Sequence, residues 1–444
     1  MSSGGGAQTR LTYEDALAYI TGLGRFGMKL GLERMGAILA ELGHPERGRR
    51  GALIAGTNGK GSTSAFLESI LRAGGLRTGM TPSPHLSSYT ERVQLDGEPI
   101  AETTFAQAVA ELRPRLEPVI ARLGEPTEFE ALIALAISWL APRADRLVIE
   151  VGMGGRLDST NVLDLGVAIV TNVTLDHRKH LGSTVGRIAA EKAGIIKAGN
   201  VVVTGATGTA LRVVERASAA CGAADLWRLG REIRLRSRWR GWAGSEMDVS
   251  GPGFAYSGLR TSLVGAFQPG NAALAVAAAH ALGDATPSAV RAGVAAARWP
   301  GRLERVGERL ILDGAHNQDG MRKLVRSLRW LLHDQPVTVV FGAMADKDLG
   351  LVFDELRRLE PDHVVFTAAP SAGARAVRPR ALASGWGGPA ELLPSPVEAL
   401  ARARELAGAG GWVLVTGSLY LVGELRDQNS LPPGGGGAGC GGAR

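Results

Sequence analysis

The strongest chemical signal in the sequence is a glycine-rich segment built around one lysine. Directly after the apolar run 52–55 it reads Gly56, Thr57, Asn58, Gly59, Lys60, Gly61 and Ser62. Such a loop between a strand and a helix directs backbone N–H groups at a polyphosphate, while its lysine contacts the terminal phosphates and a first-turn hydroxyl binds Mg²⁺. The spacing departs from G-x₄-G-K-[ST], because Ile54 replaces the first glycine and Gly61 separates Lys60 from Ser62. The competing interpretation is an ordinary turn in a glycine-rich protein.

Glu150 and His177 follow two further apolar runs and are the next candidates for chemistry. Ligands of α/β folds bind where parallel strands end, and a carboxylate there can hold Mg²⁺ against a phosphate. A lone histidine is more often structural than a ligand, but the place of His177 at the same sheet edge as Ser62 and Glu150 makes the two roles about equal. Lys192 belongs to a predicted helix, where a lysine is usually a solvated charge. The glycines at 152 and 154 are a weak dinucleotide signal, because no G-x-G-x-x-G follows.

A second set of polar motifs lies in the last third of the chain. Within it, Asp313 and Ser418 each follow an apolar run. They therefore belong to the carboxyl edge of a second predicted sheet. Two such edges facing each other would form a cleft. Basic side chains and a metal ion in that cleft suit phosphoryl transfer, which depends mainly on positioning and charge neutralisation.

Two blocks of alternating strands and helices must position these residues. The predicted strands are 52–55, 146–151, 167–172, 201–204, 310–313, 337–341, 363–367 and 413–416, and the predicted helices of the first block are 62–73, 105–112, 130–140 and 185–193. This alternation predicts mainly parallel sheets with helices on both faces. Trp299-Pro300-Gly301 is the predicted boundary, which separates a domain at 11–298, with a β-rich extension near 225–265, from one at 299–427. The glycine-rich ends, 1–10 and 428–444, are predicted to be disordered.

Composition bounds the classes of protein to consider. The 444 residues are 45% hydrophobic, which excludes wholesale disorder, and the net charge is +7. Only seven of the 50 basic residues are lysines, so each lysine becomes a candidate for a role that arginine cannot fill. Two cysteines give no disulfide framework. No signal peptide or membrane-length apolar run is apparent, which predicts a cytoplasmic protein without a membrane partner.

Taken together, the motifs resemble the folylpolyglutamate synthase/dihydrofolate synthase family of the Mur ligase superfamily over about residues 12–426. They occur in the family's order: 56–62, 83–86 with 91–92, 127–130, 150–161, 175–177, 191–196, 301–304, 313–317, 346–348 and 416–420. The resemblance implies an α/β fold, with a P-loop ATP-binding central domain of Mur ligase type and a smaller Rossmann-like C-terminal domain. It also implies a monomer.

The resemblance further implies an ATP-dependent amide ligase. A substrate carboxylate attacks the γ-phosphate of ATP, and the amine of L-glutamate then displaces phosphate from the acyl phosphate. The acceptor is 7,8-dihydropteroate in one reaction and the γ-carboxylate of a folate in the other. One or both activities are open at this point.

The family's roles transfer to this sequence by motif. Lys60, His177 and Lys192 are the catalytic residues, and Lys192 stands at the position that the family carbamylates. ATP is bound by the 56–62 loop together with Asn271, Arg302, Asp313 and His316. One Mg²⁺ is bound by Ser62 and Glu150, and a second by His177. The pterin or folate side is formed by Ser83, His85, Arg92, Phe129 and Asp158, and the glutamate side by Ser418. Pro82 replaces the family's usual serine or threonine, which stiffens the substrate loop.

Other functions are also considered. The alternatives are a monofunctional folylpolyglutamate synthase, another Mur-type amino-acid ligase, a P-loop switch without ligase activity, and a basic nucleic-acid binder. A uridine-nucleotide Mur ligase would need a domain before Gly56, where only about 50 residues stand. Arginines and tryptophans mix between 225 and 242, but a solvated strand face explains them better than nucleic-acid binding does.

Overall fold

The first part of the molecule is built on an eight-stranded sheet with the order β4-β3-β2-β5-β1-β6-β7-β8. The computed structural model describes residues 11–24 and 31–428. Neighbouring strands from β2 to β8 are parallel, and β3 and β4 add an antiparallel hairpin at one edge. The strands are β1 Gly51–Ala55, β2 Thr78–Thr81, β3 Gln94–Leu95, β4 Glu98–Pro99, β5 Arg146–Glu150, β6 Gly166–Val170, β7 Val201–Thr204 and β8 Asp225–Arg228.

Helices cover both faces of this sheet, which explains why its central strands are almost wholly apolar. Alternate residues of β1 enter opposite cores: Leu53 and Ala55 pack on one face, and Ala52 and Ile54 on the other. The first face is covered by α1 Tyr13–Gly22, α2 Glu33–Glu41, α4 Glu102–Leu123, α5 Glu128–Leu140, α7 Val185–Ala193 and α8 Gly208–Cys221. The second is covered by α3 Lys60–Ala73, α9 Gln268–Ala281 and α10 Pro287–Ala296.

A three-stranded antiparallel sheet forms the predicted β-rich extension. It consists of β9 Arg234–Trp239, β10 Ser245–Gly251 and β11 Phe254–Thr261, in the order β11-β10-β9. Met247 and Leu259 pack into the core that α9 shares. The arginines at 234, 236 and 238 are exposed along β9. They therefore form the solvated strand face that the sequence favours.

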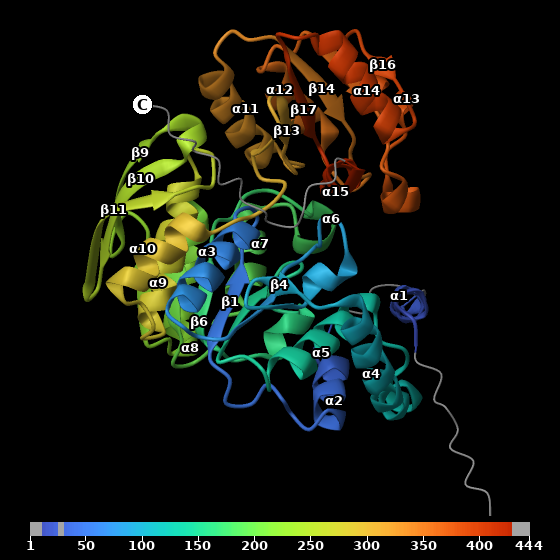
Figure 1. The fold of residues 1–444 in the computed structure, drawn as a ribbon. Helices are drawn as coiled ribbons and strands as arrows, with labels where there is room; N and C mark the ends of the chain where they lie inside the picture. Colours follow the sequence, from blue (N-terminus) through green and yellow to red (C-terminus); the bar gives the residue numbers. More distant parts are fainter. Residues whose placement is uncertain (1–10, 25–30, 429–444) are drawn as a thin grey trace, which may run out of the picture.

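The second part of the molecule is a six-stranded sheet with the order β12-β13-β17-β14-β15-β16, which Figure 1 shows above the first part. All its neighbours are parallel except β12 and β13. The strands are β12 Glu304–Val306, β13 Leu310–Leu312, β14 Val337–Phe341, β15 His363–Phe366, β16 Glu391–Leu392 and β17 Trp412–Thr416. The helices are α11 Gln318–Leu332, α12 Leu349–Arg357, α13 Pro379–Trp386, α14 Pro396–Ala407 and α15 Leu419–Gln428. The change of sheet falls between α10 and β12, where the sequence places the domain boundary.

One predicted element differs clearly from the structure. The helix expected at 105–112 extends over Glu102–Leu123 and contains Pro114 and Pro118. It continues because buried residues recur at helical spacing through Leu116 and Val119, while both prolines lie on the exposed side. The predicted disorder of 1–10 and 428–444 falls outside the described residues, except that Gln428 ends α15.

Along the described chain, no helix combines the length and the apolar character that crossing a membrane requires.

Candidate functional site

The glycine-rich loop connects β1 to α3, and the segment after β6 fixes its backbone. Asn172 Oδ1 accepts the N–H of Asn58 at 2.8 Å, and the Thr171 hydroxyl donates to the Asn58 carbonyl at 2.7 Å. A Cβ at Gly56, where φ is +155°, would collide with Thr171 Oγ1, so glycine is needed there. The loop is thus held rigidly at the N-terminus of a 14-residue helix, which is a site for anions.

Lys60 and Lys192 meet at one carbonyl. Lys60 Nζ donates to the Gly56 oxygen at 3.2 Å, and Lys192 Nζ donates to the same oxygen at 2.9 Å. Lys192 lies on α7 and is only 4% exposed. Burial, reinforced by the charge of Lys60, lowers the pKa of Lys192 to about 7. The interpretation of Lys192 as a solvated surface charge is therefore wrong, because α7 packs its last turn against the loop.

Glu150 is the last residue of β5 and lies beside Lys60. Its Oε1 is 3.8 Å from Lys60 Nζ, and its Oε2 accepts the N–H of Ser83 at 3.1 Å. Burial raises the pKa of Glu150, while the charge of Lys60 opposes that rise. Ser62, in the first turn of α3, is also buried and accepts a hydrogen bond from Gln268 at 3.3 Å. Both side chains line the same cavity as the loop.

His177 stands at the end of the segment after β6, in a left-handed backbone conformation with φ +48°. Its Nδ1 lies 3.6 Å from Asp346 Oδ2, and its Nε2 lies 3.9 Å from Asp176 Oδ2. Burial lowers the pKa of His177 to about 4, so the imidazole is neutral at pH 7 and is able to act as a metal ligand. Burial disfavours ionised Asp176, but Lys347, His316 and His177 together hold its pKa below the usual value.

The second domain contacts the loop directly at the N-terminus of α11. Asn58 Nδ2 donates to Asn317 Oδ1 at 3.2 Å and to Asp319 Oδ2 at 2.9 Å. Asn317 Nδ2 donates in turn to Asp176 Oδ2 at 2.8 Å. Because these side chains come from both domains, the phosphate-side loop and the second domain form one polar network.

Asp313 and His316 belong to the same edge of the second domain. Asp313 is buried and accepts the N–H groups of Leu303 and Ala315, both at 2.8 Å. His316 Nδ1 is hydrogen-bonded to the Gly314 carbonyl at 2.8 Å, and burial lowers the pKa of His316 to about 4. Asp313 therefore organises the backbone of this edge, while His316 presents a neutral imidazole to the cavity.

These groups line one cavity of about 290 Å³ between the two domains. Asn271 and Arg302 complete it: Asn271 Oδ1 faces Gly59 so closely that a Cβ there would lie 2.6 Å away, and Arg302 Nη1 donates to the Gly301 carbonyl at 3.0 Å. The predicted nucleotide side is thereby assembled. Its lining includes Gly56, Thr57, Asn58, Gly59, Lys60, Gly61, Ser62, Asn271, Arg302, Asp313 and His316.

A larger cavity of about 1070 Å³ contains all five residues predicted for the pterin or folate side. Arg92 connects two of them, because its Nε donates to His85 Nδ1 at 3.0 Å and its Nη1 to Ser83 Oγ at 3.3 Å. Burial, and then Arg92, lower the pKa of His85 to about 3, so this imidazole is neutral. Phe129 lies in the first turn of α5, and Asp158 accepts the N–H of Met153 at 2.9 Å.

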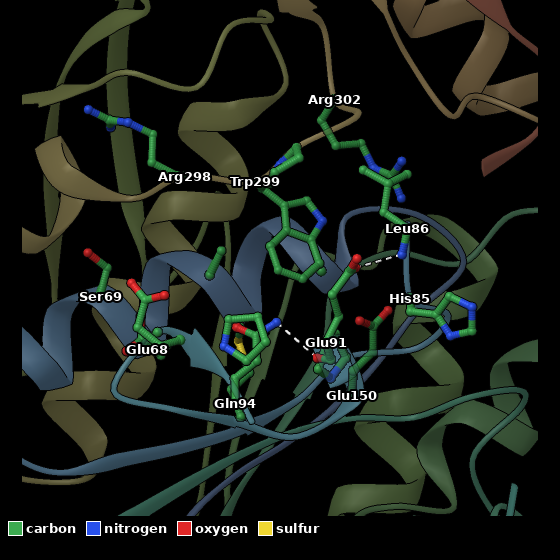
Figure 2. A pocket seen from close by; sticks show the side chains of 18 of the residues that line it. Glu68, Ser69, His85, Leu86, Glu91, Gln94, Glu150, Arg298, Trp299 and Arg302 are labelled. Atoms are coloured by element: carbon green, nitrogen blue, oxygen red, sulfur yellow. Dashed lines mark hydrogen bonds between the residues drawn. The ribbon is translucent and has the colours of Figure 1, made fainter. Parts of the chain in front are cut away.

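A third cavity, of about 390 Å³, lies between α3, the Ser83 segment and the connection between the domains. Figure 2 shows the Trp299 indole near the centre of the view, with Glu91 and Glu150 below it and the Arg302 side chain extending above Leu86. Pro82 lines this cavity and not the pterin-side one. The stiffening of the loop that proline causes therefore applies to the wall of this cavity. Ser83 lines all three cavities and marks the place where they meet.

Comparison with known proteins agrees with this architecture. Residues 54–279 match the Mur ligase middle domain, and residues 301–419 match the Mur ligase glutamate ligase domain. The dihydrofolate synthase/folylpolyglutamate synthase of Bacillus subtilis is 35% identical over 94% of this chain and 99% of its own. The protein of the same name from Escherichia coli is 33% identical, over 93% and 94%.

Solved structures give the same answer. The folylpolyglutamate synthase of Mycobacterium tuberculosis complexed with ADP has a TM-score of 0.89 at 31% identity, covering 95% of this chain and 99% of that one. The chain belongs to the folylpolyglutamate synthase/dihydrofolate synthase family of Mur ligases. An Escherichia coli member in complex with DHPP and ADP has a TM-score of 0.86 at 31% identity, over 94% and 98% of the two chains. The predicted family and two-domain Mur ligase fold are confirmed.

In this family member, the predicted residues line two adjoining cavities that meet at Ser83, with one exception. Ser418 is buried just before α15, where its Oγ accepts the N–H of Tyr420 at 3.2 Å, and its neighbour Leu419 lines the cavity instead. Sequence analysis assigned no role to Asn172, Asp176 or Lys347, although all three contact the site. Lys347 offered a signal, because it is one of seven lysines and stands between two aspartates.

Proposed function

We propose that this protein is an ATP-dependent ligase that joins L-glutamate to 7,8-dihydropteroate and to the γ-carboxylate of folates. The observation that carries this proposal is the convergence of three cavities at Ser83, beside Glu150 and the glycine-rich loop. The reaction has three substrates, which are ATP, an acceptor carboxylate and an amino acid. The names of the relatives agree with this activity.

The phosphates of ATP would be bound by the backbone of the 56–62 loop and by Lys60. Lys60 is suited to this position because a compact ammonium on a slim stem fits where the loop backbone crowds the phosphates. The acceptor carboxylate oxygen attacks the γ-phosphorus, the bond to the β,γ-bridging oxygen breaks, and ADP leaves with that electron pair. The neutral glutamate amine then attacks the acyl carbon, loses a proton and expels phosphate.

Ser62 and Glu150 fit a first Mg²⁺, and His177 fits a second. The donor chemistry is suitable, because a buried carboxylate and a hydroxyl line the same cavity with unused oxygen lone pairs, and the His177 imidazole is neutral. Among the residues described, no group of three or more His, Cys, Asp or Glu side chains is set to hold a metal. Each cation would therefore complete its shell with phosphate oxygens and water, as Mg²⁺ commonly does. Bound there, Mg²⁺ supplies charge neutralisation at the phosphates.

Lys192 is proposed to carry a carbamate. A neutral amine attacks CO₂ and forms an N–C bond with release of one proton, so a lysine whose pKa burial lowers to about 7 supplies far more neutral amine at pH 7 than an ordinary lysine does. The Lys60 ammonium shares the Gly56 carbonyl with Lys192 and would neutralise the resulting anion. Arginine cannot replace Lys192 in this role, because a guanidinium forms no such carbamate.

Purified protein tests this function when it is incubated with ATP, Mg²⁺, bicarbonate, L-glutamate and 7,8-dihydropteroate. Release of both ADP and dihydrofolate is expected, and a second assay with reduced folates separates two activities from one. Glu150→Gln should abolish both products, whereas Glu405→Gln, whose side chain is 67% exposed, should not change them. A protein that consumes neither acceptor would refute the proposal. Folate-only turnover would favour a monofunctional synthase.

We further propose that the protein acts in the cytoplasm as a monomer, without a membrane or nucleic-acid partner. Gel filtration at assay concentrations tests the monomeric state, and a gel shift at low salt tests the absence of nucleic-acid binding. Retarded DNA or RNA would contradict the proposal, because electrostatic binding is strongest at low salt.

A further inference from the structure

Lys347 reaches across the interface between the two domains. It lies in the loop between β14 and α12, and its Nζ donates to Asp176 Oδ1 of the first domain at 3.0 Å. The same Nζ is 3.3 Å from Asp346 Oδ2 and 3.5 Å from His177 Nε2. Its side chain is only 7% exposed. This ammonium thus faces two carboxylates and one imidazole. Asp176 is buried with it, at 8% exposure, whereas His177 and Asp346 are 33% and 43% exposed, so the cluster opens to solvent on their side.

This arrangement conflicts with a metal ion on the same histidine. A divalent cation bound to an imidazole nitrogen lies about 2 Å from it. At Nε2 of His177, such an ion would fall close to the Lys347 ammonium, and two cations at that separation repel each other, the more so because Lys347 itself is buried. At Nδ1 it would lie beside Asp346, which Lys347 also contacts. At Nε2 the ion would thus take the place of Lys347, and at Nδ1 it would compete with Lys347 for Asp346 Oδ2.

We propose that Lys347 is a positioning residue that holds the second domain against Asp176 until a divalent cation at His177 displaces it. This inference rests on the proposed function, in which His177 is a metal ligand. Removing a buried ion-pair partner leaves Asp176 and Asp346 without their shared cation. Lys347 therefore weakens metal binding to the nucleotide-free protein, and its departure couples metal binding to a movement of the second domain.

Titration of the nucleotide-free protein with Mn²⁺, followed by the electron paramagnetic resonance signal of free Mn²⁺, tests this inference. We expect Lys347→Gln and Lys347→Met to bind Mn²⁺ at least about fivefold more tightly than the wild type, because each removes the competing charge. Lys347→Arg keeps the charge and should retain the wild-type affinity. Arg358→Gln is the matched control, since it removes one exposed cation of the same domain, and its partner Glu355 keeps its second ion pair with Arg322.

His177→Ala in the Lys347→Gln background tests whether the additional Mn²⁺ affinity depends on His177. If the gain in Mn²⁺ affinity disappears, the metal binds at His177 and Lys347 competes with it. If Lys347→Gln and Lys347→Met both melt like the wild type and bind Mn²⁺ with wild-type affinity, the inference is wrong. An equal gain in Arg358→Gln would also refute it. If His177→Ala leaves Mn²⁺ binding in the presence of AMPPCP unchanged, the proposed second metal site fails instead.

Discussion

Lys192 is a residue whose chemistry depends on its surroundings. With a pKa near 7 in the folded protein and 10.5 ordinarily, the unfolded chain binds a proton between these values that the folded chain does not. Stability therefore rises with pH through this window. Below pH 7 the full cost of burying the ammonium is present, and by pH 10.5 it has vanished.

One prediction about stability follows from this shift in pKa. In bicarbonate-free buffer, Lys192→Met should stabilise the protein at pH 6, and the gain in the free energy of unfolding should shrink steadily by pH 9. Urea denaturation at both pH values measures it. A gain that is the same at pH 6 and pH 9 would show that Lys192 keeps an ordinary pKa.

The carbamate at Lys192 predicts a second set of results. Labelling with ¹³C-bicarbonate should give a carbamate resonance that grows from pH 6 to pH 8, because the neutral amine fraction grows. Lys192→Ala should reduce turnover by about 100-fold, the scale of losing one charge-stabilising group, and Lys192→Arg should not recover it. Wild-type turnover in the arginine variant would eliminate the carbamate role.

The Trp299 side chain limits the size of the residue at position 61. A Cβ at Gly61 would lie 2.6 Å from Trp299 Nε1, which belongs to the connection between the domains. We expect Gly61→Ala to raise the KM for ATP about tenfold by displacing either the loop or Trp299, equivalent to about 1.4 kcal/mol. The double variant with Trp299→Ala should regain most of that affinity. An unchanged KM in Gly61→Ala would show that Trp299 moves freely.

At the scale of elements, the start of α5 depends on a buried ion pair. Glu130 completes a capping box with Thr127, and Arg34 on α2 binds the same carboxylate through Nε and Nη2, with Nη2 at 2.6 Å. Arg34 and Glu130 are both buried. Phe129 lies between the capping residues, so the pair fixes the helical turn that forms one wall of the pterin-side cavity.

Breaking this pair should affect both stability and substrate binding. Arg34→Met leaves Glu130 buried without its partner, which costs about 3 kcal/mol or more in the free energy of unfolding, and it should raise the KM for dihydropteroate through Phe129. Arg122→Gln, which breaks an exposed pair with Glu41, should cost less than about 1 kcal/mol. Comparable losses in the two variants would remove Arg34 from this role.

The order of strands and helices was predictable because local patterns determine it. The strand 201–204 and the helix 185–193 match the structure residue for residue. The length of α4 was not predictable from local signals, because the exposed side of a helix tolerates prolines that a sequence rule treats as breaks. The contacts of Asn58 with Asn317 and Asp319 could not be predicted from the sequence either. They join residues about 260 positions apart, and only the packing of two domains brings them together.

At the scale of the whole molecule, the two domains meet at a second place besides the polar network at the site. The three-stranded sheet reaches the second domain, as Figure 1 shows. Trp239 lies against Trp330 of α11 with ring centroids 4.4 Å apart, and Trp242 stacks on Trp412 at 5.4 Å and 11°. The Arg305 guanidinium lies over both rings of the second pair, at 5.7 and 5.5 Å. A contact between domains therefore accounts for Trp239 and Trp242, whereas Trp227 packs against Phe254 and His280 inside the first domain.

Helix α11 connects the polar network at the site with the tryptophan contact. Its N-terminus is at Asn317, in the polar network, and Trp330 lies near its other end, about 20 Å away at 1.5 Å per residue. A helix held at both ends resists rotation of the second domain, whereas one held only at the site can pivot there. The tryptophan contact thus sets the angle at which His316 and Asp313 face the glycine-rich loop.

Trp330→Ala tests whether the tryptophan contact sets this angle between the domains. Trp330 is 49% exposed, so its loss should cost only about 1–2 kcal/mol, well below that of a fully buried tryptophan. We expect the kcat/KM for ATP to fall several-fold, the radius of gyration in solution scattering to increase, and calorimetric unfolding to separate into two transitions. Trp139→Ala is the matched control, since Trp139 is partly buried on α5 and packs against Arg143 at 4.8 Å, away from the second domain. A single transition with unchanged kinetics in Trp330→Ala would mean that the polar network alone holds the domains, because the aromatic contact would then contribute nothing to their relative position.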